Sequence, residues 1–365
     1  MLRADVLIVG GGPAGSACAT ALADRGRDVI VLDVCVFPRD KPCAGWLTPE
    51  AVAELPIDFA EYARTRTAQP IVGFRLGKIG GRAIELRYDA PVSHGIRRVE
   101  LDDAVLRGSG ARVVQGHRVR TVERRNGAWV LDGAYAAPYL VGAGGHACPV
   151  ARLVAGPPAA AATVVAVEAE YPLAGAAGCR VSPEVPELYF CADFLGYGWC
   201  FRKGEYLNVG LGRLDPRHLR AQLQEFLGFL VERGRIATPP RRGWRGHSYA
   251  LRDGTARRLV GDRVALVGDA AALAFPASGE GIFPALVSGT LAAEAILGER
   301  LGEYPTRLAG RLGGVRTAGG PPGRLQAWLG GAALRSRPLA RRLVLERRFL
   351  HGRRGRARAA FATAS

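Results

Sequence analysis

The chain has 365 residues, 48% of them hydrophobic and 23% charged, which is typical of a core-forming globular protein with one large domain or two interleaved ones. The formal net charge is +17, but only three of the 50 basic residues are lysines. We interpret this excess as an arginine-rich composition and not as a nucleic-acid surface, so nucleic acid is not expected as a partner.

Seven cysteines are spread along the chain without a C-x-x-C pair, which argues against a zinc motif and a disulfide framework. The N-terminus begins with a strand-like apolar run and lacks the charged, apolar and cleavage regions of a signal peptide. The most apolar later stretch, residues 153–167, contains prolines and is shorter than the roughly 18 residues of a membrane-spanning helix. We therefore expect separate reduced thiols, no metal site and a cytoplasmic protein.

The N-terminal segment alternates strand, glycine turn, helix and strand. Residues 5–9 (DVLIV) predict a buried strand, the turn is GGGPAG (10–15), and residues 16–26 have helical periodicity. A second strand follows at 28–33 and ends in Asp33. A G-x-G-x-x-G turn in this context, with an acid about 20 residues further on, predicts a dinucleotide site.

The residues of this turn have physical roles. Gly10 allows the tight turn, Gly12 lets the backbone approach a pyrophosphate, and Gly15 lets the helix pack close to the strand. The helix N-terminus supplies free N–H groups to the phosphates. Asp33 can accept hydrogen bonds from the adenosine ribose hydroxyls, which argues against a 2′-phosphate and therefore against NADP in this pocket. The predicted dinucleotide-binding residues are Gly10, Gly12, Pro13, Ala14, Gly15 and Asp33.

A second signature, at 261–297, resembles the second FAD motif of the p-hydroxybenzoate hydroxylase-like flavoproteins. Its strand ends in Gly268 and Asp269, a loop with the turn GEGI (279–282) follows, and a small-residue helix completes it. The resemblance implies that Asp269 bonds a ribityl hydroxyl of FAD. It also implies that the turn lays N–H groups near the pyrimidine end of the flavin. The residues implied for FAD are Gly268, Asp269, Pro276, Gly279, Gly281 and Ile282.

Two segments between these motifs also bear on the cofactor. Residues 95–114 resemble the arginine-then-leucine-aspartate helix of the same family, which implies that Arg98 approaches the flavin or its pyrophosphate. Arg97 is the competing choice, and a surface ion pair is the alternative without a ligand. Residues 139–154 resemble the Gly-Ala-Asp-Gly segment, but Gly144 stands where the aspartate is expected. That aspartate helps to organise pyridine-nucleotide contacts in the hydroxylases, so the reductant, NAD(P)H or ferredoxin, is left open.

The stretch GYGWCFRKGEYLNVGLG (196–212) resembles the geranylgeranyl reductase signature, Tyr-x-Trp-x-Phe-Pro followed by Gly-x-Gly. Arg202 and Phe194 stand where prolines are expected, and the Trp-x-Trp-x-Ile-Pro run of flavin halogenases fits less well. Aromatic residues at alternate positions share one face of a strand, so they either line an apolar pocket or fill a core. The candidate substrate-binding residues here are Tyr197, Trp199 and Phe201.

The stretch KPCAGWLTP (41–49) places Cys43 and Trp46 between two prolines. Cys43 has no C-x-x-C partner, which leaves a buried inert thiol or a cavity residue that positions flavin or substrate. In the resembling family this segment runs from the adenosine site to the flavin ring. The resemblance therefore makes Cys43 the candidate catalytic residue and Trp46 a candidate substrate contact.

By these motifs the chain is identified as a member of the geranylgeranyl reductase-like FAD oxidoreductases. The implied fold is α/β, with a p-hydroxybenzoate hydroxylase-like Rossmann-type FAD-binding domain, an inserted antiparallel-sheet substrate domain and a helical C-terminus. We expect the FAD-binding domain to comprise residues 1–75, 96–158 and 246–300. The substrate domain would comprise 76–95 and 159–245, followed by an arginine-rich segment at 301–365.

The implied reaction is the reduction of a double bond in a hydrophobic substrate, isoprenoid or polyketide-like, by hydride transfer from reduced flavin. His94, His146 and Cys43 are candidate proton donors, with no residue favoured. One alternative is an FAD-dependent monooxygenase that hydroxylates or epoxidises a hydrophobic or aromatic substrate through a C4a-hydroperoxyflavin. Another is a non-catalytic flavin-bound protein that docks on a membrane.

The charge of the chain is concentrated near its C-terminal end. From Arg335 to Arg358 ten arginines stand against one acid, Glu346. This pattern leaves a peripheral membrane contact open, and a solvated helical surface is the alternative. An electron-donor protein is also open as a partner, in addition to the hydrophobic small-molecule substrate.

Overall fold

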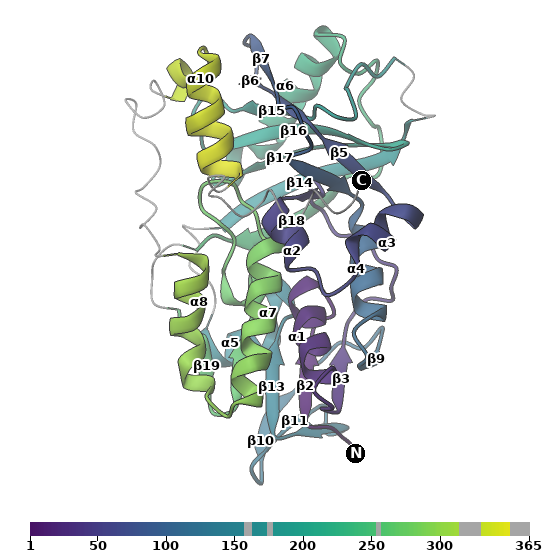
Figure 1. Cartoon of the computed structure of the whole chain (residues 1–365), viewed down its shortest axis with the longest axis vertical. Coiled ribbons are helices and arrows are strands. Elements are labelled where there is room, and N and C mark those ends of the chain that lie inside the picture. Colours follow the sequence, from purple (N-terminus) through teal and green to yellow (C-terminus); the bar gives the residue numbers. More distant parts are fainter. Residues whose placement is uncertain (157–162, 174–177, 253–256, 314–329, 351–365) are drawn as a thin grey trace.

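A six-stranded sheet forms the lower half of the molecule in Figure 1, which shows the computed structural model. Its order is β19-β20-β13-β2-β3-β9, and all strands are parallel except β19. β2 and β3 are buried along their whole length, as expected for parallel strands covered on both faces. The strands are β2 (Val6–Val9), β3 (Val29–Leu32), β9 (Arg112–Val114), β13 (Tyr139–Gly142), β19 (Val260–Gly261) and β20 (Val264–Leu266). The structure describes residues 1–156, 163–173, 178–252, 257–313 and 330–350.

Helices cover this sheet, and the first of them, α1, packs between α4 and α7. α1 and α7 approach so closely that a Cβ at Gly289 of α7 would overlap the carbonyl oxygen of Ala14. The α-helices of this half are α1 (Pro13–Ala23), α4 (Arg98–Arg107), α5 (Pro149–Ala155), α7 (Ile282–Leu297) and α8 (Tyr304–Leu312). Single 3₁₀ turns lie at Gly145–Ala147, Gly268–Ala271 and Leu301–Glu303.

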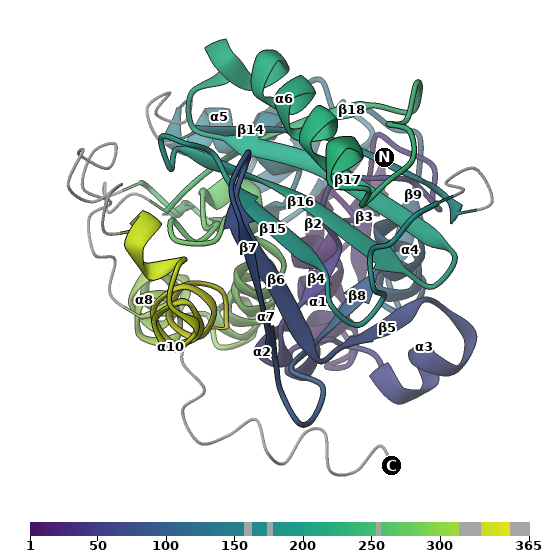
Figure 2. The ribbon, with the colours of Figure 1, turned by 90° about the horizontal axis from the view of Figure 1, so that it is seen from above.

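A seven-stranded sheet forms the upper half, in the order β18-β14-β17-β16-β15-β6-β7. It is antiparallel except where β15 pairs with β6. In the view from above (Figure 2), α6 lies across its outer face, and its apolar side buries Phe226 and Leu230 there. The elements are β6 (Gly73–Lys78), β7 (Ala83–Arg87), β14 (Thr163–Pro172), β15 (Glu187–Phe190), β16 (Gly196–Lys203), β17 (Tyr206–Arg213), β18 (Arg245–Ala250), α6 (Leu219–Glu232) and a 3₁₀ turn at Pro216–His218.

Two smaller sheets complete the strands. One has the order β4-β8-β5 and joins the loop after β3 to the start of α4. The other, β1-β12-β11-β10, extends the lower end of the molecule. The remaining elements are β1 (Leu2–Arg3), β4 (Trp46–Leu47), α2 (Pro49–Ala53), α3 (Phe59–Thr65), β5 (Ala68–Ile71), β8 (Ser93–Ile96), β10 (Val122–Arg125), β11 (Ala128–Leu131) and β12 (Tyr135–Ala137).

A C-terminal helix, drawn in yellow, stands against the inner face of the upper sheet (Figures 1 and 2). It consists of α10 (Arg337–Leu339) and a π-helical continuation, Ala340–Phe349. Its buried side chains join the core formed by β6, β7, β15 and β16. No described helix is long and apolar enough to cross a bilayer.

The strand pairing bears on the domain division expected above. β6 begins at Gly73 and β18 runs from Arg245, and both belong to the seven-stranded sheet. We therefore propose a two-domain division in which these two strands go with the sheet domain in place of the Rossmann-type domain. The expected boundary near 158 and the arginines beyond 350 lie outside the described residues.

Candidate functional site

The glycine turn after β2 is built so tightly that side chains are excluded from it. Gly10 has φ of +110°, and a Cβ there would overlap the carbonyl oxygen of Ala143 at the end of β13. A Cβ at Gly15 would overlap the carbonyl oxygen of Gly10. The N-cap of α1 is Gly12, which has no side chain to cap the first-turn N–H groups. These amides are therefore available to an anion.

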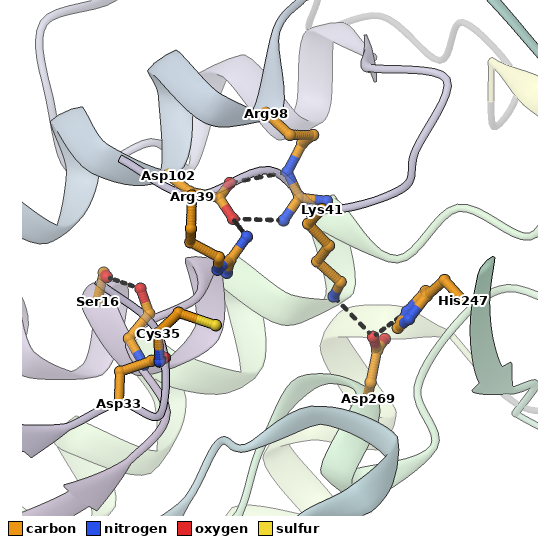
Figure 3. Close-up of polar contacts among 10 residues, drawn as sticks. Ser16, Asp33, Cys35, Arg39, Lys41, Arg98, Asp102, His247 and Asp269 are labelled. Carbon is orange, nitrogen blue, oxygen red and sulfur yellow. Dashed lines mark hydrogen bonds and ion pairs between the residues drawn. The ribbon is translucent and has the colours of Figure 1, made fainter. Parts of the chain in front are cut away.

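Asp33, at the carboxyl end of β3, fastens this turn (Figure 3). Its Oδ2 accepts a hydrogen bond of 2.7 Å from the backbone N–H of Gly11, and its Oδ1 accepts one of 2.8 Å from that of Cys35. The hydroxyl of Ser16 donates to the carbonyl oxygen of Gly11 at 3.0 Å, which holds the turn from the helix side. Asp33 thus lies next to the glycine turn, as the dinucleotide motif requires.

Three charged side chains meet beside the turn (Figure 3). Arg98 donates two hydrogen bonds of 2.7 Å to the carboxylate of Asp102, and Arg39 lies 2.8 Å from the same carboxylate. Burial alone would raise the pKa of Asp102, but the two guanidinium groups hold it below its usual value. The Arg39 guanidinium also lies 3.5 Å from the place of a Cβ on Gly12. Arg39 therefore puts a positive charge over the N-terminus of α1.

Asp269, the first acid after β20, carries a second group of contacts (Figure 3). Its Oδ2 lies 3.0 Å from Lys41 Nζ and 3.4 Å from His247 Nε2. Burial alone would raise the pKa of Asp269, but the Lys41 ammonium and the His247 hydrogen bond hold it well below its usual range. The other oxygen, Oδ1, faces Gly281, 3.4 Å from the place of a Cβ there. Asp269 is thus a fixed carboxylate between the loop at 41–49 and the glycine turn before α7.

The turn 276–282 leads from Asp269 into α7. Gly279 has φ of +74°, and a Cβ there would lie 2.6 Å from the hydroxyl of Tyr249. Gly281 is the N-cap of α7 and Ile282 its first residue, so the helix N-terminus opens at this turn. Pro276, the first residue of this turn, is exposed to solvent.

The loop at 41–49 bridges the two halves of the molecule. Thr48 caps α2 and donates a hydrogen bond of 3.0 Å to Glu280 in the turn before α7. The carbonyl oxygen of Cys43 accepts a hydrogen bond of 3.2 Å from Asn208 of the upper sheet. The Cys43 thiol accepts one of 3.4 Å from the N–H of Gly45 and lies beside Arg98. Cys43 is therefore in the interface between the Rossmann-type domain and the sheet, and it is half-buried.

Aromatic side chains gather where this loop meets the inner face of the upper sheet. The ring of Trp46 lies 4.7 Å from that of Phe74 and 5.9 Å from that of Phe201. From the C-terminal helix, the ring of Phe349 stacks on Trp46 at 5.4 Å and meets Tyr197 edge-on at 5.6 Å. The Tyr197 hydroxyl donates a hydrogen bond of 2.6 Å to the carbonyl oxygen of Ser278, next to the turn before α7. We call Trp46, Phe74, Tyr197, Phe201 and Phe349 the aromatic cluster.

Trp199 lies in a groove that two glycines create. Gly210 on the neighbouring strand is directly opposite Trp199, and a Cβ there would overlap the indole ring. Gly212 lies 3.6 Å from the same ring, measured from the place of its Cβ. The indole N–H donates a hydrogen bond of 2.7 Å to Asn208. The Gly-x-Gly of the sequence signature therefore makes room for the tryptophan of the same signature.

Polar residues lie next to Trp199 on the same inner face of the sheet. The Lys203 ammonium lies 2.5 Å from Glu170, and Arg97 donates to Glu170 at 2.8 Å. Glu168, two residues before Glu170 on β14, is almost fully buried. Its Oε2 has no hydrogen-bond partner among the described residues. Burial raises the pKa of Glu168 to about 7, against the opposing effects of Lys203, the Cys43 backbone and Asn208. Arg97 thus holds the sheet to α4, whereas Arg98 points into the Rossmann-type domain.

The chain is similar in sequence to a nucleotide-binding domain family and to two reductases. A model of the NAD(P)-binding Rossmann-like domain matches residues 8–42. The chain is 33% identical over 333 residues to the menaquinone reductase of Mycolicibacterium smegmatis, covering 83% of this chain and 78% of the relative. It is 30% identical over 336 residues to the chloroplastic geranylgeranyl diphosphate reductase of Oryza sativa subsp. japonica, covering 81% and 66%. The chain belongs to the geranylgeranyl reductase-like family of FAD-dependent oxidoreductases.

A solved structure bears out the fold of this family. The geranylgeranyl bacteriochlorophyll reductase-like protein from Thermoplasma acidophilum superposes with a TM-score of 0.73 at 22% identity, covering 100% of this chain and 97% of that one. The expected family and the expected fold class, a Rossmann-type domain with an antiparallel sheet, are therefore confirmed.

The predicted residues of this oxidoreductase fall into three places. The first glycine turn and Asp33 lie together, with Arg98 nearby on α4. The second glycine turn and Asp269 lie together at the start of α7, apart from the exposed Pro276. Trp46, Tyr197 and Phe201 meet in the aromatic cluster, whereas Trp199 lies beside it in its glycine groove.

The family motifs do not include several residues that the structure places at the site. Arg39 and Lys41 carry positive charges beside Asp102 and Asp269, and His247, whose pKa is lowered by burial, hydrogen-bonds Asp269. Glu168 and Lys203 lie under the Cys43 loop. One signal was available for Lys41 and Lys203, because they are two of only three lysines in an arginine-rich chain. Of the other proton-donor candidates, His94 packs on Phe59 and burial lowers its pKa to about 4, and His146 lies in the 3₁₀ turn after β13.

Proposed function

We propose that this chain is an FAD-dependent reductase that saturates a double bond in an isoprenoid chain. The observation that carries the proposal is the aromatic cluster, which touches the turn before α7 through the Tyr197–Ser278 hydrogen bond. A hydrophobic chain in that cluster would lie against the same turn that the family motif assigns to the flavin. The names of the relatives, a menaquinone reductase and a geranylgeranyl diphosphate reductase, support an isoprenoid substrate.

The residues present fit FAD. Gly10, Gly12 and Gly15 leave a cradle that side chains would fill, and Arg39 places a positive charge over the uncapped N-terminus of α1. Pro13 and Ala14 open that helix, and Asp33 would meet the adenosine ribose. FAD supplies a two-electron reservoir that delivers hydride to carbon. The residues assigned to its ribityl and flavin end are Arg98, Gly268, Asp269, Pro276, Gly279, Gly281 and Ile282.

The chain's own residues would orient and shield the reaction. The turn at 279–282 and the N-terminus of α7 present N–H groups that stabilise negative charge on a reduced flavin. Cys43 lies between Arg98 and the sheet, where it would position flavin or substrate. Trp46, Trp199, Tyr197 and Phe201 exclude water from the reacting double bond.

The experiment is anaerobic reoxidation of the reduced protein. The purified protein is reconstituted with FAD, reduced with dithionite and mixed with geranylgeranyl diphosphate or with menaquinol, whose ring is already reduced. The proposal predicts that the oxidised flavin spectrum returns without oxygen. A flavin that stays reduced under anaerobic conditions with both substrates would contradict the proposal. Reoxidation on admission of air decides nothing, because reduced flavin reacts with oxygen in reductases and oxygenases alike. Failure to retain any FAD would remove the basis of the proposal.

The position of Gly144 favours a donor other than NADPH. A Cβ at this position would lie 3.3 Å from the Sγ, Cβ and Cα of Cys148, so an aspartate here would require Cys148 to shift by a few tenths of an ångström. We infer that a reduced ferredoxin or a similar protein delivers the electrons. Rapid flavin reduction by NADPH alone, at a rate that matches turnover, would contradict this inference.

The C-terminal helix supports a peripheral contact with an anionic membrane. Leu339 and Leu343 are 45% and 42% exposed, and they lie among exposed arginines. The arginines of this face are Arg335, Arg337, Arg341, Arg342, Arg347 and Arg348. Replacing Arg337, Arg342, Arg347 and Arg348 with Gln should reduce flotation with phosphatidylglycerol vesicles, whereas Gln at the exposed Arg25 and Arg27 should not. Equal flotation of both variants would contradict the contact.

A further inference from the structure

Glu168 is a buried carboxyl group that the family motifs leave without a role. It lies on β14 and is 4% exposed. Glu168 is directly opposite Gly210, which is directly opposite Trp199, so the three residues share the inner face of the sheet. The place of a Cβ on Gly210 is 2.8 Å from the Glu168 Cβ and overlaps the indole, so the Trp199 ring extends across β17 toward Glu168.

Its surroundings leave one carboxyl oxygen free. Oε2 is buried and has no hydrogen-bond partner among the described residues. The Cys43 backbone and the Asn208 side chain contact the carboxyl group, and Asn208 also bonds the Cys43 carbonyl oxygen. An unpaired carboxylate oxygen in this position is costly, whereas a protonated carboxyl group can direct its O–H toward a ligand. Glu168 thus has a hydrogen-bonding position to spare beneath the Cys43 loop.

The neighbouring acids and hydroxyls are already committed. The Tyr197 hydroxyl donates to Ser278, and Glu170 is paired with Lys203 and Arg97. The pKa of His94 is lowered to about 4 by burial, so this ring is neutral near pH 7. The titratable and charged groups on the elements around Glu168 are Glu170 of β14, Lys203 of β16, Arg97 at the start of α4, Arg245 and His247 of β18 and Cys43 of the loop.

We propose that Glu168 supplies the proton that completes reduction of the double bond, an inference that rests on the proposed function above. The π bond of the substrate breaks, one carbon receives hydride from the reduced flavin, and the neighbouring carbon receives the proton of the Glu168 carboxyl group. The flavin is oxidised by two electrons and the alkene is reduced by two. Glu168 is left as a carboxylate and takes up a proton from water before the next turnover.

The test compares Glu168→Gln with Glu187→Gln. Glu187 is a buried carboxyl group on the opposite face of the same sheet, where it hydrogen-bonds Tyr189 and Arg235. The anaerobic reduced proteins are mixed with geranylgeranyl diphosphate or menaquinol, and flavin reoxidation is followed by absorbance. Glu168→Gln should slow reoxidation by at least roughly 100-fold without loss of bound FAD, because general acid catalysis contributes about 10²- to 10⁴-fold. Glu187→Gln should reoxidise at the wild-type rate.

Two further readouts separate proton donation from a structural role. The wild-type reoxidation rate should fall as the pH rises above about 7, where Glu168 loses its proton, and the residual rate of Glu168→Gln should not follow this profile. The melting temperature of the wild type should also fall between pH 6 and pH 8 more than that of Glu168→Gln. The unfolded chain ionises this carboxyl group more readily than the folded one, so stability is lost as the pH rises through the folded pKa.

The outcomes distinguish this inference from the proposed function. Reoxidation of Glu168→Gln at the wild-type rate, with the wild-type pH profile, would overturn the role of Glu168 and leave the proposed reductase intact. If neither substrate reoxidises the wild-type protein, the proposed function fails and the inference fails with it.

Discussion

Gly210 determines where the indole of Trp199 lies. The ring occupies the volume that a side chain at 210 would take, and it is then held by its hydrogen bond to Asn208. The aromatic residues of the signature are therefore not equivalent. Tyr197 faces the turn before α7, and Phe201 is fully buried against Trp46 in the aromatic cluster. Trp199 extends over Gly210 toward Glu168 and hydrogen-bonds Asn208.

Gly210→Ala should displace this ring. Overpacking of this kind costs about 1–3 kcal/mol of unfolding free energy, and the displaced indole should lower turnover while FAD stays bound. Gly212→Ala is the matched control, because a Cβ there lies 3.4 Å from the nearest atom, an ordinary contact. Urea denaturation and flavin absorbance of both variants provide the measurement. Equal stability and turnover of the two variants would contradict the groove.

How much of the site could be predicted depends on how local each feature is. The glycine turn and Asp33 lie within 24 residues, and their spacing follows from the geometry of one βαβ unit. The pair of Lys41 and Asp269 joins residues 228 positions apart. Such a pair depends on how the loops that follow two different strands meet in space. Neither the periodicity nor the spacing of residues in the sequence predicts that contact.

At the scale of elements, the C-terminal helix closes the aromatic cluster. Phe349 stacks on Trp46 and meets Tyr197, so the segment that carried no recognisable motif contributes a side chain to the candidate substrate site. An arginine-rich pattern predicts a solvated or docking face, and the exposed arginines have that position. The side chains that this helix buries against the upper sheet could not be predicted, because the strands that they contact are far away in the sequence.

Phe349→Ala should destabilise the protein and open the cluster. Removing a buried phenylalanine costs about 3–5 kcal/mol of unfolding free energy, and the space left should admit bulkier prenyl substrates. Leu343→Ala, on the exposed face of the same helix, should change stability by no more than about 0.5 kcal/mol. Chemical denaturation of both variants checks the difference. A loss for Leu343→Ala as large as that for Phe349→Ala would contradict the packing.

At the scale of the whole molecule, burial of titratable groups sets the pH dependence of stability. His94 lies on β8 between the two halves, and burial lowers its pKa to about 4. The unfolded chain therefore binds a proton at this residue more readily than the folded chain does. Its contribution to stability is present above pH 6.5 and is lost as the pH falls toward 4.

Replacing His94 with Gln should reduce this acid sensitivity. The wild type should lose roughly 1–2 kcal/mol more than His94→Gln between pH 7.5 and pH 5, whereas Gln at the exposed His218 should leave the wild-type slope unchanged. Urea denaturation at the two pH values measures this difference. Parallel pH profiles for the wild type and His94→Gln would show that His94 is not buried as described.

The halves of the molecule also differ in how far their organisation could be anticipated. The Rossmann-type half follows from two motifs and buried parallel strands. In the upper sheet, the place of β6 beside β15 depends on pairing between residues more than 100 positions apart. For this reason the domain boundaries, which depend on such pairing, are harder to predict from the sequence than the motifs.

The most direct test of the proposed activity is the mass of the product. The reduced protein is incubated anaerobically with geranylgeranyl diphosphate or menaquinol, and the quinol ring is reoxidised in air before mass spectrometry. The proposed reductase predicts that the prenyl chain gains two hydrogens for each double bond reduced and gains no oxygen. No gain of hydrogen in the anaerobic incubation, together with a product that carries one additional oxygen atom when the same incubation is run in air, would contradict the proposal.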